Sequence, residues 1–120
     1  MTGIEYLSTI NELEKIDAGM AEAIQKKYGH ELPEIIKRII SFSKETVFLE
    51  NDTRILSASE IIQAEEELHV KFSALQLIPL VDCGDNNFIV YHFSDGSWSK
   101  FNLNDESIFK QHKSLEELLK

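Results

Sequence analysis

The spacing of hydrophobic residues changes near Thr46, and this change restricts the folds open to the chain. Before Thr46, apolar residues recur every three or four positions, which is typical of one face of a helix. After it, short runs of β-branched and aromatic residues alternate with turn-forming residues, which is typical of strands. The sequence therefore predicts an α+β domain in which helices flank a single antiparallel sheet.

The first half predicts three helices, near residues 4–15, 20–28 and 33–43. Gly29 is a predicted helix stop, and Pro33 fits the first turn of the third helix. The third helix has the clearest pattern, because one wide apolar face carries Ile35, Ile36, Ile39 and Ile40.

The sheet is predicted to run from about residue 46 to 103, beginning with a hairpin that turns at Asn51 and Asp52. Ser57 and Glu60 have capping-box spacing and predict an inserted helix over 58–68. Ser114 and Glu117 repeat this spacing and predict a short C-terminal helix over 114–119. Residues expected to share the core are Ile36, Ile39, Ile40, Leu80, Ile89 and Phe101.

Length and composition predict a single domain over residues 1–120, because 120 residues with 42% hydrophobic content suffice for one core. No apolar stretch approaches the roughly 20 residues of a membrane span, and residues 1–7 lack the basic region of an export signal. The single cysteine, Cys83, excludes an internal disulfide and suits a reducing compartment. We therefore expect a cytoplasmic protein that does not associate with membranes.

The charge balance points to the kind of partner. The chain has 21 acidic and 12 basic residues, a net charge of −9, and such a surface repels nucleic-acid phosphates and anionic lipids. We therefore expect no nucleic-acid partner. Two interpretations remain: acidity that serves only solubility, and an acidic face matched to a basic protein.

Only one cluster has residue types that could bind a metal or act as an acid and base: Asp82, Cys83, Asp85 and His92. Three interpretations stay open: hydrogen bonding within a turn with Cys83 in the core, contact with a protein partner, and metal binding or catalysis. The four histidines show no metal-protease spacing, and no serine-hydrolase or phosphate-binding loop motif is present. We therefore predict no catalytic residues, no metal site and no cofactor.

Two further features are candidates for partner contact. Strand alternation sets Trp98 apart from Phe101, so Trp98 either projects from the sheet as an interface residue or is buried under helices. The acidic run Glu65–Glu67 is either a solvated helix face or a surface that attracts a basic partner.

Taken in order, four segments resemble the SUKH superfamily, which includes yeast cell-wall synthesis regulators and many bacterial immunity proteins. They are IQKKYGHELPEIIKRII, RILSASEI, LIPLVDCGDNNFIVYHF and SLEELL, within about residues 24–119. The double glycine common after the Leu-Pro helix is replaced here by residues 41–44, and the acidic turn has one glycine, so the chain resembles a divergent branch. The resemblance implies an α+β fold and a protein-binding role.

The expectation from residues and resemblance together is a non-enzymatic immunity protein that neutralises a cognate toxin, such as a nuclease or deaminase. The alternative is a regulatory adaptor in cell-wall synthesis or signalling. The candidate partner-binding residues are Asp82, Asp85, Asn86, Trp98, Glu65 and Glu66.

Overall fold

A computed structural model describes all residues from 1 to 120, and three helices precede the sheet, one is inserted in it and one follows it, as the sequence predicts. The helices are α1 (Gly3–Asn11), α2 (Ala18–Tyr28), α3 (Glu34–Phe42), α4 (Ala58–Leu68) and α5 (Glu116–Leu119). The strands are β1 (Val47–Phe48), β2 (Arg54–Ile55), β3 (Leu77–Gly84), β4 (Asn87–His92), β5 (Trp98–Asn102) and β6 (Ile108–His112). The predicted α+β class is confirmed.

Capping explains where the helices begin and end. Ser57 and Glu60 form the predicted capping box, and α4 has the predicted bounds. Gly29 ends α2 at a φ of 74°, a left-handed conformation that glycine adopts without strain. The capping box predicted at Ser114 is wrong, because α5 begins at Glu116 after Leu115 with no side-chain cap.

Helix α1 ends four residues earlier than the predicted 15, because another helix binds its last carbonyl groups. The Arg38 guanidinium of α3 donates hydrogen bonds to the backbone oxygens of Ile10, Asn11 and Leu13 at 3.0–3.2 Å. These bonds satisfy carbonyls that a longer helix would have paired internally.

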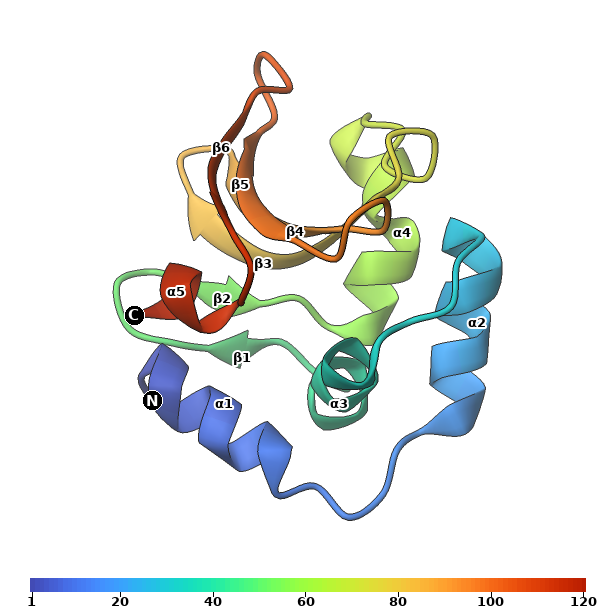
Figure 1. Ribbon diagram of the computed structural model, residues 1–120, viewed down its shortest axis with the longest axis vertical. Helices are drawn as coiled ribbons and strands as arrows, with labels where there is room; N and C mark the ends of the chain where they lie inside the picture. The colour runs from blue at the N-terminus through green and yellow to red at the C-terminus, as the bar shows by residue number, and fades with distance from the viewer.

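The six strands form one antiparallel meander in the order β1-β2-β3-β4-β5-β6. In Figure 1 the sheet curls through the upper left of the view, α1 and α3 lie below it, and α2 and α4 lie to its right. The chain ends come close together, and a Cβ on Gly3 would lie 2.4 Å from the Leu119 carbonyl oxygen. No helix has the length and apolar character that crossing a membrane requires.

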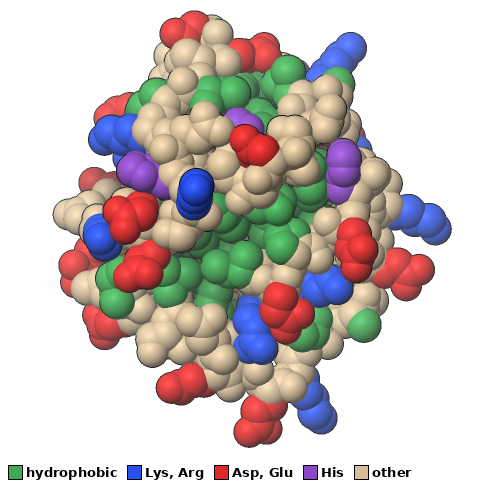
Figure 2. All heavy atoms as spheres, viewed as in Figure 1, with side chains coloured by type: hydrophobic (Ala, Val, Ile, Leu, Met, Phe, Trp, Pro, Cys, Tyr) green, Lys and Arg blue, Asp and Glu red, His purple; other side chains and the backbone are tan.

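The helices and sheet enclose one cluster of 26 buried hydrophobic residues. All the residues predicted for the core belong to it and are at most 1% exposed: Ile36, Ile39, Ile40, Leu80, Ile89 and Phe101. The core also reaches α1 through Tyr6, whose hydroxyl lies 2.9 Å from the hydroxyl of buried Ser43. Figure 2 shows further hydrophobic side chains at the middle of one face of the molecule.

Candidate functional site

The meander places three turns at the same end of the sheet, because alternate connections between antiparallel strands return to one end. These turns join β1 to β2, β3 to β4, and β5 to β6. The second and third turns are bonded together: the Asn86 side-chain amide donates to the Asn104 amide oxygen at 3.3 Å, and the Leu103 amide donates to the Asn86 carbonyl at 2.9 Å. We call residues 50–52, 85–86 and 104–106 the turn margin; in Figure 1 it follows the upper left border of the molecule.

Asparagine and aspartate occupy the first two turns of the margin because those turns need a positive φ. Asn51 and Asp52 have φ values of 60° and 57°, and Asp85 and Asn86 have values of 52° and 62°. Two consecutive residues of this kind form the tight hairpin turn whose twist matches that of the strands, and Asn and Asp tolerate it better than most residues. The residues that make the turns therefore also bring carboxylates to the surface.

The turn margin carries negative charge that nothing within it neutralises. Its carboxylates are all exposed and form no ion pairs: Glu50, Asp52, Asp85, Asp105 and Glu106. No Lys or Arg lies in the three turn segments. Hydrogen bonding from Ser107 lowers the pKa of Asp105, which strengthens its ionised form. The margin is thus a strip of solvated negative charge available to a positively charged surface.

Of the predicted contact residues, only Asp85 and Asn86 lie exposed on this margin. Asp82 is half-buried, forms an ion pair with Arg54 at 3.1 Å and accepts a hydrogen bond from the Gly84 amide at 2.9 Å. Arg54 also pairs with Glu60 at 2.6 Å. Asp82 therefore helps to hold the sheet against the start of α4. Both of its carboxylate oxygens already have partners within the chain.

Glu65 and Glu66 lie on α4, away from the turn margin (Figure 1). The Glu65 carboxylate accepts hydrogen bonds from the Ser73 amide and hydroxyl, the shortest being 3.0 Å. Glu66 forms a 2.6 Å ion pair with Lys27 of α2. Both residues thus have internal partners, and the structure does not bring them together with Asp85 and Asn86.

Trp98 is 3% exposed, so the interpretation in which it is buried is confirmed and it does not project from the sheet. Its ring packs edge-on against Tyr91, which lies opposite it on β4, with ring centres 5.0 Å apart. The register of β5 on β4 is regular, so Trp98 keeps the predicted position on the sheet face opposite Phe101. Both faces of the sheet are covered here, since successive residues of β4 are buried, and Trp98 is therefore buried as well.

The predicted group of Asp82, Cys83, Asp85 and His92 does not form. His92 pairs with Leu77 at one end of β3, whereas Gly84, next to Asp85, pairs with Asn87 at the other end. Several residues at about 3.3 Å each separate the two ends. No group of three or more His, Cys, Asp or Glu side chains is placed to hold a metal ion.

His92 instead forms a buried pair with Ser99, its Nε2 atom lying 2.7 Å from the serine hydroxyl. A serine hydroxyl beside a histidine ring is also the arrangement that activates nucleophilic serines in enzymes. However, Ser99 is 0% exposed and His92 is 8% exposed, so a substrate cannot reach the hydroxyl. Burial lowers the pKa of His92 against the opposing influence of Asp95, which favours a neutral ring acting as a structural hydrogen-bond partner.

Sequence reasoning missed Glu50, Asp52, Asp105 and Glu106 as members of one surface. A local signal for them exists, because an Asn-Asp or Asp-Asn pair stands in each turn: residues 51–52, 85–86 and 104–105. Together with the strand order, these pairs predict that all three turns lie at one acidic end of the sheet.

Comparisons of this chain with protein-family models, with curated proteins and with solved structures give no match. Three features indicate a function: the geometry of the turn margin, the net charge of −9 and the resemblance of four segments to the SUKH superfamily.

Proposed function

We propose that this chain is a non-enzymatic protein-binding domain that neutralises a cognate toxin with a basic surface. The observation that carries the proposal is the turn margin, where exposed carboxylates on three adjacent turns have no cationic partner of their own. Rigid antiparallel strands hold these turns, so the charges keep a fixed spacing for a partner to match.

Electrostatics explains why such a margin suits an inhibitor. Opposite potentials on two proteins raise the rate of productive encounter and disfavour partners of like charge. A nuclease or deaminase toxin needs a positively charged cleft for its nucleic-acid substrate, and a strip of carboxylates can occupy that cleft in place of phosphates. The resemblance to SUKH immunity proteins, which rests on sequence segments alone, supports the same role.

The same resemblance supports the alternative, a regulatory adaptor in cell-wall synthesis or signalling. Such an adaptor would use the turn margin for a host protein in place of a toxin. Gene context distinguishes the two: a polymorphic toxin gene beside this one favours immunity, whereas an isolated gene favours the adaptor.

Co-expression with the toxin encoded beside this gene tests the proposal. We expect the unmodified chain to protect the cells, and the double variant Asp85→Lys/Asp105→Lys to lose protection, because it reverses charge on two turns of the margin. Glu12→Lys/Glu14→Lys is the matched control, since it changes net charge equally at exposed positions between α1 and α2. Equal protection by both variants would contradict the margin's role, and turnover of a substrate by the purified chain would overturn the non-enzymatic proposal.

A further inference from the structure

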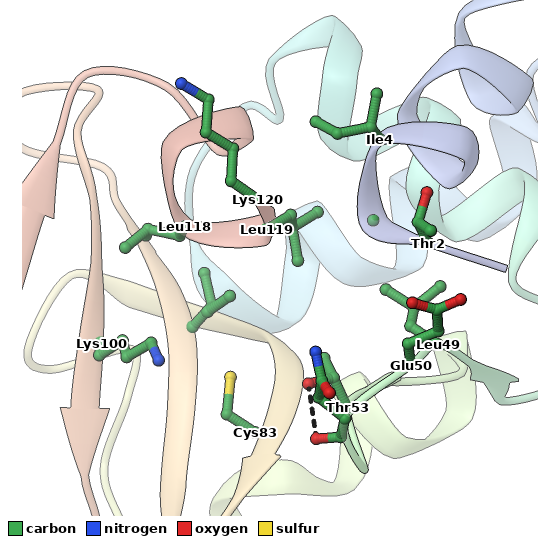
Figure 3. A pocket seen from close by; sticks show the side chains of 13 residues that line it. Thr2, Ile4, Leu49, Glu50, Thr53, Cys83, Lys100, Leu118, Leu119 and Lys120 are labelled. Carbon is green, nitrogen blue, oxygen red and sulfur yellow. Dashed lines mark hydrogen bonds between the residues drawn. The ribbon is translucent and has the colours of Figure 1, made fainter.

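A cavity of about 370 Å³ lies where the two ends of the chain meet the sheet (Figure 3). Its walls come from the start of α1, the β1–β2 turn, the strands β3 to β5, and α5. Figure 3 shows Cys83 and Lys100 on the sheet side and Leu118 and Leu119 on the α5 side. Its volume is within the range of about 300–1,000 Å³ that small-molecule sites occupy.

Lys100 is the unusual member of this cavity. It lies on β5, is half-buried, and forms neither a hydrogen bond nor an ion pair. The other cation that lines the cavity, Lys120, already pairs with Glu117 at 3.1 Å. The Lys100 Nζ atom is reached by solvent, since no buried side-chain nitrogen lacks a partner, and it is therefore free to bind an anion.

The residues around Lys100 do not neutralise it. Burial is the main influence on the Cys83 thiol and raises its pKa, so this neighbour is an uncharged thiol near neutral pH. Asp82, the preceding residue, directs its carboxylate to Arg54 instead. Glu50 also lines the cavity, but it is an exposed residue of the β1–β2 turn.

The other walls of the cavity determine what uncharged group a bound anion can carry. Leu118 and Leu119 of α5 are partly exposed and give the cavity an apolar wall that a ligand can reach, whereas Ile89, opposite Lys100 in the sheet, is 0% exposed. Thr2 and Thr53 also line the cavity, but their hydroxyls already bond to the Glu5 amide and the Asn51 carbonyl. An apolar wall beside a single free ammonium suits a ligand with one negative charge and a hydrocarbon part.

We propose that this cavity binds a small organic monocarboxylate, its carboxylate on the Lys100 ammonium and its short apolar tail against Leu118 and Leu119 of α5. A phosphate dianion fits less well, because the cavity has one free cation, no guanidinium fork, and Glu50 among its lining residues. The cavity shares Glu50 and Asn51 with the turn margin, but Lys100 and α5 would bind the ligand, so the proposal stands whether or not the chain neutralises a toxin.

Octanoate tests the site with the full chain, monitored by amide chemical shifts in a ¹H–¹⁵N NMR titration. We expect saturable shifts centred on the residues that line the cavity, and much smaller shifts with 1-octanol, which has the same tail without the charge. Lys100→Met should weaken octanoate binding at least about tenfold, because it keeps the length of the side chain and removes the ammonium.

Lys71→Met is the control, since Lys71 is exposed, follows α4 and does not line the cavity, and the change in net charge is the same. It should bind octanoate as the unmodified chain does. The NMR spectrum of each variant also reports whether it is folded. Absence of saturable shifts at millimolar octanoate, equal binding of octanol, or unchanged affinity in Lys100→Met would each overturn the proposal.

Discussion

Ile39 illustrates how single residues stabilise this fold. It is 0% exposed on the inner face of α3, and replacing it with alanine leaves a cavity in the core. We expect Ile39→Ala to lower the free energy of unfolding by roughly 2–5 kcal/mol. Ile108→Ala, at a residue that is 48% exposed, should cost far less. Chemical denaturation measures both, and a loss below about 0.5 kcal/mol for Ile39→Ala would contradict its central packing.

The buried residue His92 makes the free energy of unfolding depend on pH. Because burial holds its pKa below the ordinary value of 6.5, the unfolded chain takes up a proton first as the pH falls. The contribution of the neutral ring is therefore complete above pH 6.5 and is lost as the pH falls from there toward the lowered pKa.

We expect the free energy of unfolding to fall as the pH decreases below 6.5, and His92→Gln to reduce this fall, because glutamine can bond to Ser99 without titrating. His112→Gln, at an exposed residue of β6, should keep the slope of the unmodified chain. Denaturant titrations at several pH values measure the slopes. Identical slopes for the unmodified chain and His92→Gln would contradict this assignment.

At the residue scale, the sequence predicted the face on which a side chain lies better than whether that face is covered. The isoleucines of α3 could be assigned to the core because three- and four-residue spacing places them on one helix face. Alternation also placed Trp98 on the sheet face opposite Phe101, and the regular pairing of β5 with β4 agrees with it. Its burial could not be predicted, because alternation along one strand contains no information about what packs on each face.

At the scale of elements, Glu60 joins β2, the start of α4 and the segment before β1. Its carboxylate accepts hydrogen bonds from the Thr46 hydroxyl and Arg54 at 2.6 Å and from the Ser57 amide at 3.0 Å. Partial burial acts to raise its pKa, but these hydrogen bonds and the Arg54 charge outweigh it and lower the pKa to about 2. Its stabilising effect is therefore present above pH 4.5 and lost as the pH falls toward about 2.

We expect Glu60→Gln to lower the free energy of unfolding at neutral pH by about 1–3 kcal/mol, because hydrogen bonds to a charged group are lost or weakened. Glu116→Gln, at an exposed residue with no ion pair, should be nearly neutral. Thermal and chemical unfolding of the two variants compare them directly. A Glu60→Gln variant as stable as Glu116→Gln would show that the network contributes nothing.

Elements with strong local signals were predictable, and those fixed by distant contacts were not. Helix α4 follows from its capping box and keeps the predicted bounds. Strand β6 was missed because residues 108–112 are mostly polar and exposed, and they are ordered as a strand by pairing with β5. The end of α1 was misplaced because Arg38, more than twenty residues away, satisfies its carbonyl groups.

At the scale of the whole molecule, the sequence predicted the acidity and the turn that contains Asp85, but not the surface to which it belongs. The turn margin exists because six strands pair in chain order, which brings residues 50–52, 85–86 and 104–106 to one end of the sheet. No spacing rule along the chain relates these segments. Predicting this surface requires the sheet order first, and the strand that completes it, β6, was the one that sequence patterns missed.

Fixed negative charge on that surface predicts how the protein associates with a basic partner. The screening length falls from about 30 Å at 0.01 M salt to about 8 Å at 0.15 M, so long-range attraction weakens while short contacts persist. We expect the association rate measured by stopped flow with the cognate partner to fall markedly over this range. Asp85→Lys should lower the association rate more than it raises the dissociation rate, because Asp85 is an exposed charge of the margin.

Glu67→Lys is the control for this measurement, since Glu67 is exposed on α4, has no ion pair, and produces the same change in net charge. A smaller effect in Glu67→Lys than in Asp85→Lys would assign the steering to the turn margin, whereas equal effects would assign it to net charge alone. An association rate that does not change with salt would contradict electrostatic steering and indicate a mainly apolar interface. Phe48, 73% exposed on β1 beside the first turn of the margin, would then be the residue to replace with alanine.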